Sequence, residues 1–171
     1  MITGALVWSL TLILGIATFT MLEDLPHFKL GNFKDIQKDA QKSVNLRLKE
    51  TQKRHSWVTL DNVSRELLYA IIMSEDGQFF SHQGIDYDAL INALGENIKR
   101  REWSLGASTI SQQTVKNIYL TQSKTLYRKL QEIITTRRLE KALNKNQILE
   151  LYLNVVEFGP NIYGLKDAAR Y

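Results

Sequence analysis

The chain of 171 residues contains no cysteine and only two prolines. The absence of cysteine excludes both a disulfide framework and a thiolate metal site. Because helix breakers are scarce and Leu, Ile, Lys, Gln and Glu are common, the composition predicts a mostly helical protein. Internal repeats and low-complexity segments are also absent. The content of 44% hydrophobic and 23% charged residues is typical of one folded domain and not of a disordered chain.

Charge is missing from the start of the chain, where residues 2–22 contain no Asp, Glu, Lys or Arg. An apolar helix of about 20 residues is long enough to span the hydrocarbon core of a bilayer. A cleavable signal peptide would need a basic segment before the apolar run, and Met1 is followed by no Lys or Arg. A buried core helix is the third interpretation. We expect a transmembrane anchor over residues 1–24, whose orientation the flanking charges do not determine.

Positive charge predominates in the rest of the chain, and the net charge is +4. This balance suits an anionic partner: nucleic acid, an acidic membrane surface or a phosphorylated substrate. The basic segment 25–56 contains four apolar residues at helical spacing, namely Ile36, Ala40, Val44 and Leu48. Two interpretations of this expected juxtamembrane helix stay open: contact with anionic headgroups and a solvated spacer.

Residues 75–86 contain acids at an unusual boundary. An apolar run over residues 67–73 leads directly to Glu75 and Asp76, and Gly77 follows. A carboxylate at such a boundary can have its pKa raised by partial burial, which a general base working near neutral pH requires. The alternative is a helix end whose acids lie in a polar turn, and this stretch alone favours that alternative.

Capping residues and apolar periodicity predict the order of the helices. The expected helix starts are Asp61, Asp86, Ala107, Ser123 and Asn144. Asn144 and Gln147 have the spacing of a capping box. Asn154 lies between apolar residues of the last of these helices, so we expect its amide to make a buried structural hydrogen bond.

A first polar stripe lies in the helix expected over residues 107–120. Ser108, Gln112 and Lys116 recur every four residues and would share one face, with Gln113 beside them. A hydroxyl, an amide and an ammonium group on one face suit a sugar and a phosphate. The alternative is the wet side of an ordinary amphipathic helix.

A second polar stripe lies in the following helix. Arg128 and Lys129 precede Glu132 by four and three residues, so the three side chains share a face. Two cations beside a carboxylate suit a diphosphate. The alternative is a surface ion pair, which is common and contributes little to stability.

The order of these motifs resembles that of the bacterial peptidoglycan glycosyltransferases. These enzymes occur alone and as the polymerase half of bifunctional penicillin-binding proteins. The first motif is Glu75-Asp76-x-x-Phe79-x-x-His82-x-Gly84-x-Asp86. Residues 106–113 are similar to the family's Gly-Gly-Ser-Thr-Ile-Thr-Gln-Gln, and residues 128–132 to its Arg-Lys-x-x-Glu. Residues 145–154 and 157–164 resemble the fourth and fifth motifs, so that the resemblance covers residues 57–171.

The resemblance implies a mainly α fold, with a lysozyme-like helical catalytic lobe and a smaller membrane-proximal lobe in residues 57–171. The implied reaction is the polymerisation of lipid II with inversion at C1 and release of undecaprenyl diphosphate. The implied location is the outer, periplasmic side of the bacterial inner membrane, with a single-pass anchor. The expected partners are lipid II, the growing glycan chain, the membrane, penicillin-binding proteins and divisome or elongasome proteins, and not nucleic acid.

The resemblance also assigns site residues. Glu75 maps onto the general base, and Glu132 maps onto a second acid that contacts the donor diphosphate or its metal. The positions that map onto substrate binding are Asp76, Phe79, His82, Ser108, Gln112, Gln113, Lys116, Lys124, Arg128 and Lys129. A divalent cation, Mg²⁺ or Mn²⁺, that bridges the diphosphate is implied by the family, although the sequence contains no dedicated metal motif. No organic cofactor is expected.

The sequence departs from the family pattern in several places. Ala107 and Ser111 replace Gly and Thr, and Lys124 and Gln131 stand where many members carry Arg and Lys. The sequence stops at Tyr171, inside the expected lobe, so we expect a truncated domain that resembles monofunctional members. Two alternatives stay open: a lysozyme-type glycoside hydrolase, and an inactive homologue that binds lipid II or cell-wall synthesis proteins.

Overall fold

A computed structural model describes residues 11–12, 15–16, 20, 25, 32–49, 55–101, 106–121, 123 and 125–170. Most of them are helical, which confirms the predicted mainly α fold. Most of the expected anchor, residues 1–24, lies outside the described residues, as does Lys124. Among the described residues, none of the helices has both the length and the apolarity to cross a bilayer.

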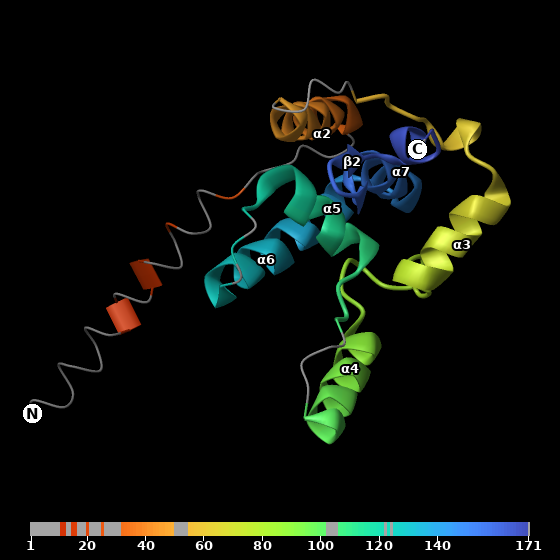
Figure 1. Ribbon diagram of the computed structural model, residues 1–171. Helices are drawn as coiled ribbons and strands as arrows, with labels where there is room; N and C mark the ends of the chain where they lie inside the picture. Colours follow the sequence, from red (N-terminus) through yellow and green to blue (C-terminus); the bar gives the residue numbers. More distant parts are fainter. Residues whose placement is uncertain are drawn as a thin grey trace, which may run out of the picture.

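The elements follow one another along the chain as a series of helices and one short hairpin. They are α2 (Phe33–Leu48), η1 (Leu60–Asn62), α3 (Arg65–Glu75), α4 (Tyr87–Arg100), α5 (Ile110–Tyr119), α6 (Leu126–Ala142), α7 (Lys145–Val155), β1 (Glu157–Gly159), β2 (Ile162–Tyr163) and α8 (Leu165–Ala168). Helix α5 packs against α2, α6 and α7, and these four helices supply most of the buried core. Helix α4 extends away from this group (Figure 1), whereas α3 packs Leu68, Ile71 and Ile72 against the edge of the core.

Helix α2 is part of the core. Its four apolar residues, Ile36, Ala40, Val44 and Leu48, are at most 3% exposed and belong to the main hydrophobic cluster. The helix packs on α5 and α7. The stripe is therefore covered by protein, and the interpretation of the helix as a solvated spacer is wrong. Lys34, Lys38 and Lys42 on the other faces of α2 are exposed, so their contact with anionic headgroups stays a prediction. The boundary between residues 56 and 57 stays a prediction.

Three helices begin later in the chain than the sequence predicted, because a capping residue follows each predicted start. Asp61 lies in the short η1, and α3 begins after Ser64, whose hydroxyl accepts from the Leu67 amide. Helix α5 begins at Ile110 and not near Ala107, because Thr109 accepts from the Gln112 amide. Likewise, Thr125 caps α6 in place of Ser123.

The other predicted caps are confirmed. The Asp86 carboxylate accepts from the Ala89 amide across 2.8 Å and begins α4. Asn144 and Gln147 form the reciprocal capping box of α7.

The structural role predicted for Asn154 is confirmed. Its side chain is completely buried in α7 and hydrogen-bonds both backbone groups of Val58, each across 2.8 Å. The amide therefore acts as a short strand partner for the segment that leads into α3. The antiparallel β1–β2 hairpin that follows α7 was not predicted.

Candidate active site

Glu75 is the last residue of α3, and its side chain is exposed. One of its carboxylate oxygens accepts a hydrogen bond from Nε2 of Gln113 in α5, across 3.0 Å. A cavity of about 190 Å³ opens beside it, lined by Asp86 and Ser108 among others. The favoured alternative of a helix end therefore fits Glu75, whereas the burial considered for the acids at this boundary occurs at its neighbour Asp76. An exposed carboxylate beside a cavity can accept a proton from a bound hydroxyl group.

Asp76 holds the turn after α3 against the start of α5. Its carboxylate accepts from the Ile110 amide across 2.9 Å and from Nε2 of His82 across 2.9 Å. The Gly84 amide donates to Nδ1 of His82 across 3.0 Å, so Nε2 carries the proton. The Thr109 hydroxyl donates to the Gly84 carbonyl and completes a closed ring of hydrogen bonds. This ring fixes the backbone next to Glu75. Asp76 also lines the cavity, so a substrate contact by Asp76 or His82 stays a prediction.

Two further residues of the predicted binding set lie inside the protein. Phe79 is fully buried, and the Lys145 ammonium lies 4.5 Å from the centre of its ring. A side chain without exposed surface cannot touch a ligand, so the structure corrects this prediction: Phe79 anchors the turn in the core. Gln112 is also buried and forms the capping box of α5 with Thr109. The predicted face of Ser108, Gln112 and Lys116 is therefore wrong, because Ser108 precedes the helix.

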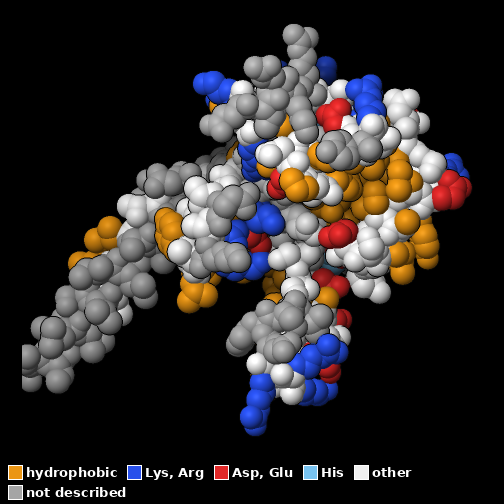
Figure 2. Space-filling model, in the orientation of Figure 1, with side chains coloured by type: hydrophobic (Ala, Val, Ile, Leu, Met, Phe, Trp, Pro, Cys, Tyr) orange, Lys and Arg blue, Asp and Glu red, His pale blue; other side chains and the backbone are white. Residues whose placement is uncertain are grey.

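Arg128, Lys129 and Glu132 share one face of α6, as their spacing predicted. Glu132 is 2% exposed, and its two oxygens lie 2.5 Å from Nη1 of Arg128 and 2.5 Å from Nζ of Lys129. Figure 2 shows the cations around the acid on the surface over α6. Because the carboxylate is buried, the alternative of an ordinary surface ion pair is wrong. We call these three residues the α6 charge cluster.

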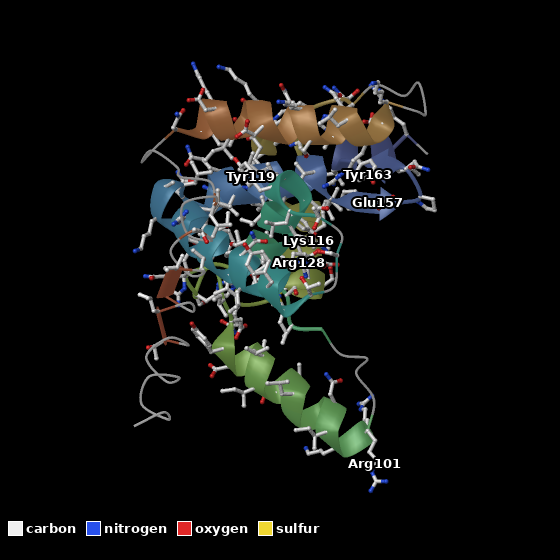
Figure 3. All side chains as sticks on the ribbon, turned by 90° about the vertical axis from the view of Figure 1, so that its left-hand side faces the viewer. Arg101, Lys116, Tyr119, Arg128, Glu157 and Tyr163 are labelled. Atoms are coloured by element: carbon white, nitrogen blue, oxygen red, sulfur yellow. The ribbon has the colours of Figure 1, made fainter. Side chains whose placement is uncertain are left out.

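Ser108 lies between Glu75 and the α6 charge cluster. Its hydroxyl accepts from Nζ of Lys129 across 3.3 Å, and its carbonyl accepts from Nε2 of Gln113, the same group that contacts Glu75. The half-buried Lys116 lies one turn after Gln113 on α5. In Figure 3, Lys116 and Arg128 project from the packed helices α5 and α6. An exposed carboxylate and a set of cations therefore share one region.

The residues present do not fit a divalent cation bound to Glu132. Both of its oxygens already contact a cationic nitrogen, and a metal ion there would face two positive charges. Within the described part of the chain, no group of three His, Asp or Glu side chains lies close enough together to hold a metal.

Tyr152 lies near the site, within residues 145–154, which resemble the fourth motif of the family. It is buried in α7, and burial, followed by the negative charge of Glu75, raises the pKa of its hydroxyl. The phenol therefore stays protonated close to the exposed carboxylate. The signal in the sequence was the hydroxyl group of Tyr152 between the apolar Leu151 and Leu153, and its proximity to Glu75 depends on how α7 packs.

Comparison with known proteins identifies the family of the chain. The family model described as Transglycosylase matches residues 41–171, which include all the site residues described above. The chain belongs to this family. The match confirms the resemblance found in the motifs.

Curated relatives agree with this family. Three of them carry the name biosynthetic peptidoglycan transglycosylase: one from Nitrosomonas eutropha is 47% identical over 69% of this chain and 48% of its own length. The relative from Chromobacterium violaceum is 44% identical over 71% of this chain and 54% of its own length. The relative from Aeromonas hydrophila is 46% identical over 72% of this chain and 52% of its own length. The chain thus spans about half the length of the curated relatives that it matches.

Proposed function

We propose that the protein polymerises lipid II into glycan strands. The observation that carries this proposal is the position of Ser108, which contacts Lys129 through its hydroxyl and Gln113, the partner of Glu75, through its carbonyl. A proton acceptor and a group of cations are thereby next to each other. A glycosyl transfer from a diphosphate requires this pair, since a hydroxyl loses its proton as a diphosphate departs.

The proposed reaction assigns one task to each group. The 4-hydroxyl of the acceptor sugar attacks C1 of the growing chain, and Glu75 takes the proton as the new bond forms. The bond between C1 and the diphosphate oxygen breaks with inversion, and undecaprenyl diphosphate leaves. Arg128 and Lys129 stabilise the negative charge of the leaving group, and Lys116 holds the diphosphate of the bound substrate. We assign Glu132 the task of holding the two α6 cations in place.

The finer parts of the expectation belong to the same proposal. We propose an anchor in residues 1–24, which the uncharged run over residues 2–22 supports. The proposals of a lysozyme-like lobe beside a membrane-proximal lobe and of a periplasmic catalytic side rest on the family resemblance. Penicillin-binding proteins and divisome or elongasome proteins are the proposed partners. We propose that the divalent cation implied by the family binds through the substrate diphosphate, and no step above depends on it.

The test is an incubation of the purified protein in detergent with fluorescent lipid II. Products are separated by size, and released undecaprenyl diphosphate is measured separately. Glycan chains that appear together with undecaprenyl diphosphate support the proposal. Cleavage of preformed glycan without diphosphate release would indicate a hydrolase, and binding of lipid II without conversion would indicate a binding protein.

A further inference from the structure

The C-terminal end of α5 is capped by side chains of α2. Nη1 of Arg47 donates to Oδ1 of Asn117 across 3.2 Å, and Nη2 donates to the Asn117 carbonyl. The Ser43 hydroxyl donates to the same carbonyl across 3.1 Å. A helix leaves its last four carbonyls without an intrahelical donor, and a cation is favourable at this end. Arg47 supplies both the donor and the charge.

Arg47 lies outside every motif of the family resemblance, although the match to the family model, residues 41–171, includes it. Its guanidinium also lies 5.5 Å from the centre of the Tyr163 ring in β2. A single side chain therefore connects α2, α5 and the β1–β2 hairpin. Such a residue is expected to fix the orientation of the helix end that it caps.

The capped turn leads directly to the proposed active site. Nδ2 of Asn117 donates to the Gln113 carbonyl across 3.0 Å, and the Gln113 side chain contacts Glu75. Lys116 immediately precedes Asn117 and shares a face of α5 with Gln113. No hydrogen bond or ion pair joins the ammonium group of Lys116 to another residue in the part of the chain that the structure describes. The direction of its ammonium group therefore depends on the last turn of α5.

We propose that Arg47 is a positioning residue for the diphosphate of the substrate. By capping the last turn of α5, it directs Lys116 toward the region of Arg128 and Lys129. Figure 3 shows Lys116 between the level of α2 and Arg128. This inference rests on the proposed function, because it takes the diphosphate as the ligand of these cations.

A double-mutant cycle tests whether Arg47 acts through Lys116. Arg47→Ala should raise KM for lipid II about tenfold, as the loss of a charged hydrogen bond predicts, and leave kcat little changed. In a Lys116→Ala background, the same substitution should have no further effect. Losses that multiply in the double variant, or an unchanged KM in Arg47→Ala, would overturn the proposal. Lys42→Ala, on the exposed face of α2, is the matched control and should keep wild-type kinetics.

Two further measurements keep the proposal testable if Arg47→Ala does not fold or if the wild type does not polymerise lipid II. Arg47→Lys keeps the charge, but a single ammonium group cannot donate to both Oδ1 and the carbonyl oxygen of Asn117 with the geometry of the planar guanidinium group. The KM of this variant should therefore lie between those of the wild type and Arg47→Ala. The Leu120 amide donates to the Lys116 carbonyl in the capped turn. Its hydrogen exchange should be about tenfold faster in Arg47→Lys or Ser43→Ala, and unchanged in Lys42→Ala.

Exchange does not depend on turnover, so it separates the two proposals. Faster exchange in the cap variants supports the capping role of Arg47 even if the wild type makes no polymer. The absence of polymer from the wild type would contradict the proposed function but not the capping role. Unchanged exchange at Leu120 in both cap variants would overturn the positioning role of Arg47.

Discussion

Nε2 of Gln113 donates a hydrogen bond to the carboxylate of Glu75 across 3.0 Å, although 38 residues separate the two in the sequence. The contact joins the end of α3 to the first turns of α5. The Glu75 side chain is exposed, and within the described residues its carboxylate has no other hydrogen bond or ion pair. The amide of Gln113 thus fixes the orientation of an otherwise exposed acid.

Replacing Gln113 should therefore slow turnover. In Gln113→Ala, Glu75 loses its partner and samples other rotamers, so kcat for lipid II polymerisation should fall about tenfold, as for a misoriented general base. Steady-state kinetics with fluorescent lipid II measure the effect. Gln83→Ala, at an exposed position of the motif over residues 75–86, is the control and should keep the wild-type kcat. An unchanged kcat in Gln113→Ala would contradict the orienting role.

The α6 charge cluster should contribute to stability because its acid is buried. Glu132→Gln leaves two cations without their counter-charge, so the free energy of unfolding should fall by about 2 to 4 kcal/mol. This value is in the lower range for buried ion pairs because Lys129 is 38% exposed. Urea denaturation followed by circular dichroism measures this change. Glu96→Gln removes an exposed acid that pairs with Lys99 in α4, and it should have no measurable effect. Equal changes in the free energy of unfolding for the two substitutions would contradict the claim that burial of the acid makes the cluster stabilising.

Two glycines provide a matched pair. A Cβ on Gly84 would lie 2.8 Å from a methyl group of Thr136, and its φ of +90° suits glycine. Gly84→Ala should therefore destabilise the protein by about 1 to 3 kcal/mol. Gly95 lies in α4 with open space around it, so Gly95→Ala should stabilise by about 0.5 to 1 kcal/mol. Melting temperatures that move in the same direction would contradict this account.

His55 should make stability depend on pH. Burial lowers its pKa below the usual value of 6.5, although the nearby Asp167 opposes the shift. The unfolded chain therefore binds a proton more readily than the folded one, so this contribution to stability is complete above pH 6.5 and falls as the pH decreases below it. Melting temperatures between pH 5 and 8 should fall less steeply on the acid side in His55→Gln than in the wild type. Parallel curves for the two proteins would exclude His55 as the cause.

Local spacing was sufficient to predict part of the site. Arg128 and Lys129 meet Glu132 because residues three and four apart share a helix face, whatever the helix packs against. The buried hydrogen bond of Asn154 also followed from its apolar neighbours.

Properties that depend on distant partners could not be predicted in this way. Glu75 and Asp76 are adjacent, and which of them is buried depends on the start of α5, whose Ile110 amide binds Asp76. The apolar stripe of α2 had a definite face, but the periodicity did not indicate whether membrane, water or protein covers it. The packing of α2 on α5 and α7 decides that question.

The most direct test of the central claim compares Glu75→Gln with Glu66→Gln. Both acids lie in α3, but only Glu75 faces the cavity and Gln113. Each purified variant is incubated with fluorescent lipid II, and its melting temperature is measured in the same buffer. We expect Glu75→Gln to make no glycan polymer at a wild-type melting temperature, because the amide removes only the base, and Glu66→Gln to polymerise normally. Substantial polymer from Glu75→Gln would contradict the account.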